Sequence, residues 1–126
     1  MKYTLLSLGI FALCLAFCLF SMATVTAVCE RTADALAVSL SAVRREAFSQ
    51  AEAALSQAED CWTRSKPFFG VVLRHEEMDE IVVGFAELRQ YLELHDLDDY
   101  QATCARLLTA LQHLKDMEKP TAENVF

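Results

Sequence analysis

The chain has 126 residues, with 18 acidic and 11 basic side chains and a formal net charge of −7. That length leaves room for one domain. All 18 acids but only 10 of the bases lie from Glu30 to Phe126, so this part carries a net charge of −8. Proteins bind nucleic acids and anionic lipids by replacing counterions with Lys and Arg. The charge therefore excludes nucleic acid as a partner and disfavours anionic lipid headgroups.

The N-terminal block from Tyr3 to Cys29 contains no charged side chain. Its apolar stretch from Leu5 to Val28 would span about 36 Å as a helix, and a bilayer core is ~30 Å thick. Secretory signal peptides have shorter apolar regions, of about 7–15 residues. We therefore predict a single transmembrane helix over residues 1–29 that acts as a retained signal anchor.

Two features leave alternatives open for this block. Small residues create cleavage sites after Ala23 and after Ala27, and cleavage there would give a secreted helical protein. The cations that flank the span, Lys2 before it and three arginines after it, favour a cytoplasmic C-terminal domain. The short charged start followed at once by an apolar run is typical of export, so we expect a cell-membrane protein with its C-terminal domain outside the cytoplasm.

Residues 30–119 are expected to form an acidic all-α domain. This part has few helix breakers, two glycines and one proline before Pro120, and no alternating apolar pattern. Pro67 and the acids after His95 mark the expected breaks. We predict helices at about 30–65, 67–94 and 98–118, arranged as a three-helix antiparallel hairpin or bundle, and a tail at 120–126.

Apolar stripes give each predicted helix an inward face. The third stripe has the clearest helical period, with steps of four and three residues: Tyr100, Cys104, Leu107, Leu111 and Leu114. The second is expected to include Phe68, Val71, Val72, Met78, Val82, Phe85, Leu88 and Leu92. The first narrows to alanines between Ala47 and Ala58, which we expect to offer a groove for another helix or a second copy of the chain.

Four segments together resemble a known protein family. They are the hydrophobic N-terminus, the region of Trp62, the run RHEEMDEI from Arg74 to Ile81, and the ending ENVF from Glu123 to Phe126. The chain is similar to a family of small uncharacterised proteins, a domain of unknown function from Gram-positive, often spore-forming, bacteria. Glu77 is an extra acid relative to the family's His-Glu-apolar-Asp pattern. The resemblance implies a membrane-anchored helical protein and brings no established activity.

His75 and Asp79 are the residues that invite a chemical interpretation. They are spaced by one helical turn, and we place His75 on the inward face of its helix. A metal site would need a third ligand, and His113 is level with Asp79 if the last two helices are antiparallel with residue numbers that sum to about 192. His113 lies off its apolar stripe and is expected to face water. We therefore expect a structural His75–Asp79 pair, with metal binding or a metal-dependent enzyme as the alternative.

Aromatic residues near the first break and at the chain end are the other candidate structural or interaction residues. Trp62 is expected to close the end of the core rather than to form an exposed patch. Phe126 is expected to pack back against the helix ends, with a frayed terminus as the alternative. Cys61 and Cys104 are expected to lie too far apart for a disulfide bond.

No catalytic motif is present, and we predict neither a catalytic residue nor a cofactor. A bundle of this size is expected to have a thin core with little room for a pocket of ~300 Å³ or more. The expected function is therefore a non-enzymatic interaction module at the membrane surface, which binds a membrane or envelope protein or a second copy of itself.

Overall fold

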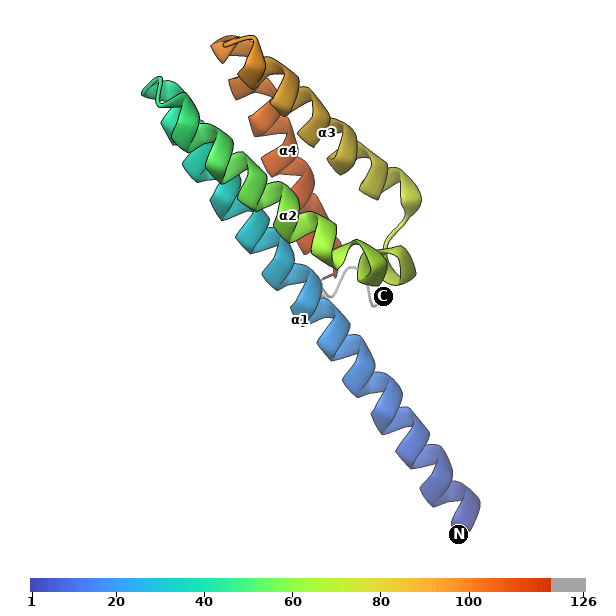
Figure 1. Ribbon diagram of the computed structural model, residues 1–126. Helices are drawn as coiled ribbons and strands as arrows, with labels where there is room; N and C mark the ends of the chain where they lie inside the picture. Colours follow the sequence, from blue (N-terminus) through green and yellow to red (C-terminus); the bar gives the residue numbers. More distant parts are fainter. Residues whose placement is uncertain (119–126) are drawn as a thin grey trace.

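The computed structural model describes residues 1–118, which form four α-helices and no strand (Figure 1). The helices are α1 (Lys2–Arg44), α2 (Phe48–Val72), α3 (His75–Glu93) and α4 (Leu97–Glu118). The predicted all-α class is confirmed, as is a long apolar N-terminal helix that precedes a helical bundle.

Helix α1 has two halves with different surroundings. Residues 1–20 are all exposed, whereas buried positions recur from Ser21 to Val43. The 43 residues are continuous, so the helix is about 64 Å long at 1.5 Å per residue. Figure 1 shows its first half projecting beyond the other helices. It is the one helix in residues 1–118 that is long and apolar enough to cross a membrane, as a membrane anchor or a signal sequence would be.

The second half of α1 packs with the other three helices as an antiparallel four-helix bundle. Helix α1 lies between α2 and α4, and α3 completes the ring by contacting α2 and α4. Ser39 of α1 bonds to Ala51 of α2, and Leu36 of α1 accepts a bond from Cys104 of α4. The expected three-helix arrangement therefore lacked one member, because the residues expected to form one helix over 30–65 form the end of α1 and most of α2.

The helix expected over 30–65 is wrong, since the chain reverses direction between α1 and α2. Glu46 adopts a left-handed conformation with φ of 59°. The Ala47 N–H then reaches back to the Ala42 carbonyl at 2.8 Å, and the Glu46 N–H to the Val43 carbonyl at 2.9 Å. This pair of bonds is a Schellman motif, which ends a helix and satisfies its last carbonyls. It is usually marked by glycine, and here no glycine marks it.

The turn between α3 and α4 repeats this geometry. His95 has φ of 55°, and the Asp96 N–H bonds to the Tyr91 carbonyl at 2.9 Å. The Asp96 carboxylate then accepts the Asp99 N–H at 3.2 Å, in the manner of a helix N-cap. The two turns meet, because the rings of Phe48 and His95 stack with centroids 4.0 Å apart. The break expected at 95–98 is therefore confirmed.

Pro67 does not end a helix, contrary to expectation, but lies inside α2. Proline removes one backbone N–H donor. Pro67 lies about one and a half turns before the end of α2, so the helix continues for only a few residues after this lost hydrogen bond. The chain leaves the helix at Leu73, whose backbone is extended with ψ of 158°. The second predicted helix is consequently divided between the end of α2 and the whole of α3.

The core follows the predicted stripes with two exceptions among the described side chains. All five residues of the α4 stripe are buried, and α3 buries Met78, Ile81, Phe85, Leu88 and Leu92. Gly84 lets α3 approach α4 closely, because a Cβ there would lie 2.9 Å from the Leu107 side chain. Val71 and Val82 were expected to point inward, but they are 78% and 40% exposed.

Candidate functional site

An open groove of about 840 Å³ runs between α1 and α2. Its α1 wall includes Val28, Arg31 and Val38, and its α2 wall includes Asp60 and Arg64. The expectation of little room for a pocket was therefore wrong. The reason is that two long helices placed side by side leave a furrow along their outer face, which a thin core does not fill.

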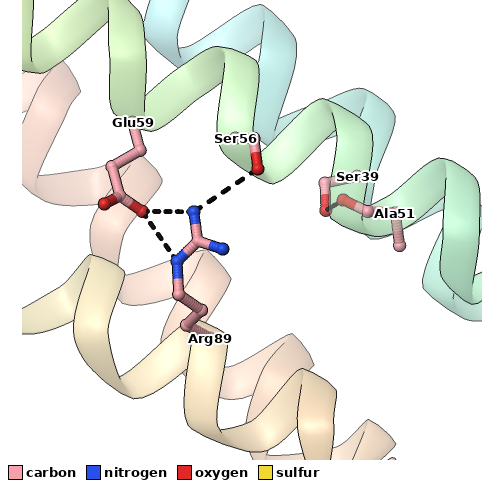
Figure 2. Close-up of polar contacts among 5 residues, drawn as sticks. All are labelled: Ser39, Ala51, Ser56, Glu59 and Arg89. Carbon is pink, nitrogen blue, oxygen red and sulfur yellow. Dashed lines mark hydrogen bonds and ion pairs between the residues drawn. The ribbon is translucent and has the colours of Figure 1, made fainter.

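The alanine stripe does not line this groove. Ala51, Ala54 and Ala58 are buried at the α1–α2 contact, so α1 of the same chain already occupies the groove we expected for a partner. Alanine side chains allow this close approach, and the Ser39 hydroxyl donates to the Ala51 carbonyl at 2.8 Å across it (Figure 2). The open groove lies on a different face of α2, next to Ala53 and Gln57.

Charges of both signs border the groove. Arg31 and Asp34 on α1, and Asp60 and Arg64 on α2, are all exposed. Within residues 1–118, the ion pairs use other side chains: Arg89 with Glu59, Arg106 with Glu87 and Lys115 with Glu30. The groove charges are therefore available to a partner.

A buried polar network lies behind α1, toward α4. The Tyr100 hydroxyl is hydrogen-bonded to the Ser39 hydroxyl. Because Ser39 donates its single hydrogen to Ala51, Tyr100 is the donor in the bond between the two hydroxyls. Burial raises the pKa of Tyr100 to about 12, and burial likewise raises the pKa of Cys104 to about 11. Both groups are thus neutral links between α4 and α1.

On the other side of α2, a guanidinium joins α2 to α3. The Arg89 side chain donates to one oxygen of Glu59 at 2.8 and 3.1 Å, and to the Ser56 hydroxyl at 3.4 Å (Figure 2). The two charged side chains are 40% and 37% exposed. Partly solvated pairs of this kind contribute little stability, so we interpret this one as fixing the register of two weakly packed helices.

The expected inward His75–Asp79 pair is wrong, because both side chains are exposed. His75 is three residues before the buried Met78, but it is the first residue of α3 and its side chain is exposed. Asp79 follows Met78 and points outward. His113 is exposed as predicted and borders a shallow hollow with Glu77 and Glu80, which supports the predicted α3–α4 register. In the described part of the chain, no three potential metal ligands gather.

The aromatic and cysteine predictions have mixed outcomes. Trp62 is 1% exposed and packs on Phe69 with ring centroids 4.7 Å apart, so its assignment to the core is confirmed. Phe126 lies outside the described residues. Cys61 and Cys104 are free thiols, as expected. Cys61 lines the groove between α1 and α2, whereas Cys104 is buried and donates to the Leu36 carbonyl of α1.

Comparison with protein families identifies the chain. A family model described as domain of unknown function DUF4363 matches residues 19–125. The chain belongs to this family. The match begins next to Ser21, where α1 enters the bundle, so the DUF4363 region and the four-helix bundle cover almost the same residues. Comparisons with curated proteins and with solved structures give no significant match.

Proposed function

We propose that this DUF4363 protein is a single-pass membrane protein whose bundle is a non-enzymatic interaction module outside the cytoplasm, at the surface of the cell membrane. The observation that carries the proposal is the continuity of α1. Its exposed part, residues 2–20, is about 28 Å long and thus matches a ~30 Å hydrocarbon core. The same helix then supplies one quarter of the bundle.

This continuity also favours a retained anchor over a secreted product. Val25 is 0% exposed and Val28 is 7% exposed. Cleavage after Ala27 would remove Ser21 and Val25 from the core, and cleavage after Ala23 would remove Ser21. If residues 1–20 are retained, their large apolar surface has to be covered by protein or lipid. N-terminal sequencing of the mature protein tests retention, and protease access to the bundle in intact cells tests its orientation.

We assign the groove between α1 and α2 to the protein partner, and a second copy of the chain is the occupant that its charges fit. Two copies anchored in one membrane share a direction, so a two-fold axis along the membrane normal relates them. Such an axis places α1 of one copy against α2 of the other. The Ser39–Ala51 contact sets equal heights on these helices, which puts Arg31 within one residue of the level of Asp60. Arg31 of each copy therefore lies opposite Asp60 of the other copy, which gives two contacts between opposite charges in the dimer.

A charge-reversal series tests this pairing. Arg31→Glu should weaken co-purification of two differently tagged full-length copies, because the introduced carboxylate would then face the carboxylate of Asp60. The double variant Arg31→Glu/Asp60→Arg should restore it. Arg45→Glu is the matched control, since Arg45 is exposed but does not line the groove. Equal co-purification of the wild type, the Arg31 variant and the control would refute the pairing. If the tagged copies never associate, the interaction-module proposal loses its assigned partner and only the anchor remains.

The metal-dependent alternative gains no support from the described residues. His75 and Asp79 are exposed, and no third ligand approaches them. Zinc titration of the full chain is the direct test: stoichiometric binding that is lost on His75→Ala would revive the alternative.

A further inference from the structure

The corner where α2 ends and α3 begins lies at the end of the bundle from which the free part of α1 extends (Figure 1). We call residues 64–75 the basic corner. Counting down α1 and up α2 from the Ser39–Ala51 contact places Phe69 level with Ser21. Ser21 is the first buried residue of α1, and every residue before it is exposed. The corner therefore lies beside the point where α1 leaves the bundle.

The distance of this corner from the membrane is fixed by α1 itself. This step rests on the proposed anchor. The free part of α1 is about as long as the hydrocarbon core is thick, and no break or linker separates it from the bundle. The bundle consequently cannot rise away from the bilayer, and the basic corner lies in the headgroup layer.

The charge of the corner is opposite to that of the chain. Between Asp60 and Glu76 there are three cations, Arg64, Lys66 and Arg74, and no acid, in a chain of net charge −7. All three are exposed, and none belongs to the ion pairs formed within residues 1–118. The acids resume at Glu76, from which α3 leads away from this end of the bundle. The corner segment is thus locally basic although the domain as a whole is acidic.

The same corner carries apolar surface that the bundle leaves uncovered. Val71 is 78% exposed, and Phe68 is half-buried. The buried Phe69 holds this segment in place, because its ring packs on both Trp62 and Phe68. An exposed valine and a phenylalanine flanked by Lys and Arg are the combination that favours binding at the boundary between headgroups and acyl chains.

We propose that the basic corner is a second membrane contact, which docks on anionic phospholipid with Val71 and Phe68 directed to the acyl boundary and Lys66 and Arg74 at the phosphates. Each Lys or Arg near an anionic surface is attracted by the surface potential of the membrane. The contact would keep the bundle upright over its own anchor. It revises the expectation, drawn from total charge, that anionic headgroups repel this domain.

Site-specific photocrosslinking tests the contact in the full chain. Benzoylphenylalanine is placed at Val71, at Leu13 in the proposed span, or at Leu94, a leucine that is 64% exposed at the end of α3 furthest from the corner. Each variant is reconstituted in nanodiscs of phosphatidylcholine with phosphatidylglycerol and irradiated. We expect lipid adducts at positions 13 and 71 and none at 94. Adducts at 13 without adducts at 71 would overturn the second contact while leaving the anchor intact.

Absence of adducts at both 13 and 71 would instead refute the anchor, and the second contact with it. The lipid dependence separates charge from proximity. Lys66→Gln/Arg74→Gln should lower the adduct yield at position 71 to that seen in discs of phosphatidylcholine alone, without changing the yield at 13. Arg44→Gln/Arg45→Gln, two exposed cations at the opposite end of the bundle, should change neither. Equal yields at 71 for all variants in both lipids would contradict anionic recognition.

Discussion

The hydroxyl network between α1, α2 and α4 allows a prediction about two substitutions. Which of them lowers the free energy of unfolding more depends on which hydroxyl donates. Ser39→Ala removes the acceptor of the Tyr100 hydroxyl and leaves that donor buried, since Tyr100 is 1% exposed. An unsatisfied buried polar group costs about 1–3 kcal/mol. The Ala51 carbonyl is less affected, because it keeps its helical partner.

Tyr100→Phe should cost less than Ser39→Ala. It deletes one hydrogen bond, worth about 0.5–1.5 kcal/mol. Ser39 still donates to Ala51, so no buried donor is left without an acceptor. The double variant should then be about as stable as Tyr100→Phe alone, because no donor remains without an acceptor. The two single costs are therefore not additive.

Urea unfolding of the full chain in detergent micelles, followed by far-UV circular dichroism, gives the three free energies of unfolding. Thr109→Ala is the control, since Thr109 is an exposed hydroxyl on α4 that bonds to the Ala105 carbonyl of its own helix. It should change stability by less than ~0.5 kcal/mol. Equal or reversed costs for the two single variants, or strict additivity in the double variant, would refute the assigned donor and acceptor.

Three further predictions concern packing, titration and the first turn. Gly84→Ala should be less stable than Gly70→Ala by ~1–3 kcal/mol in the same assay, because only the first Cβ meets a core side chain, whereas nothing lies within 4 Å of the second. Tyr100 and Cys104 have folded pKa values of about 12 and about 11, above their ordinary values of 10.0 and 9.0, so the unfolded chain releases their protons first. Stability should be intact below pH 9 and fall as the pH rises through 11 and 12. The Tyr100→Phe/Cys104→Ala variant should show a flatter alkaline profile, and an equally steep profile would contradict the assignment. Finally, Glu46→Gly should raise the melting temperature, because the left-handed backbone conformation costs a non-glycine residue about 1 kcal/mol. A lower melting temperature would show that the Glu46 side chain is needed.

The helical class and the later half of the bundle could be predicted because their signals are local. The α4 stripe has one period throughout, and acids mark its beginning at the sequence level. The predicted α3–α4 register agrees with the Gly84–Leu107 approach and the Glu87–Arg106 pair. Regular helices with short connections leave few alternative pairings, so pattern alone sufficed there.

The reversal at Glu46 could not be predicted by the same means. A Schellman turn is signalled by glycine or asparagine, and a glutamate in the left-handed region gives no such signal. The apolar stripe continues in phase across the turn, so Leu36, Leu40 and Val43 on α1 and Ala51, Ala54 and Ala58 on α2 read as one helix. Tertiary packing of α2 on α1 provides the free energy that the local sequence does not reveal.

The candidate site was mispredicted for a related reason. His75 has the spacing of a core residue, but exposure depends on which elements cover a helix end, and spacing does not contain that information. The open groove lies between the outer faces of α1 and α2, and the sequence predicted one helix over these residues. Among the candidate residues that the structure describes, Trp62 and His113, whose surroundings follow from their own helix, were placed correctly.

The pairing of α1 with α4 constrains the order of events during synthesis. The ribosome makes the first bundle helix first and its α4 partner last, so residues 21–44 emerge long before residues 97–118 can cover them. Helix α2 can fold back on α1 as a local hairpin in the interval, held by the Schellman turn at Glu46. The buried link from Tyr100 to Ser39 forms only when the chain is nearly complete. Until then one apolar face of the α1–α2 hairpin is exposed, and closure of the bundle by α4 is the step that covers it.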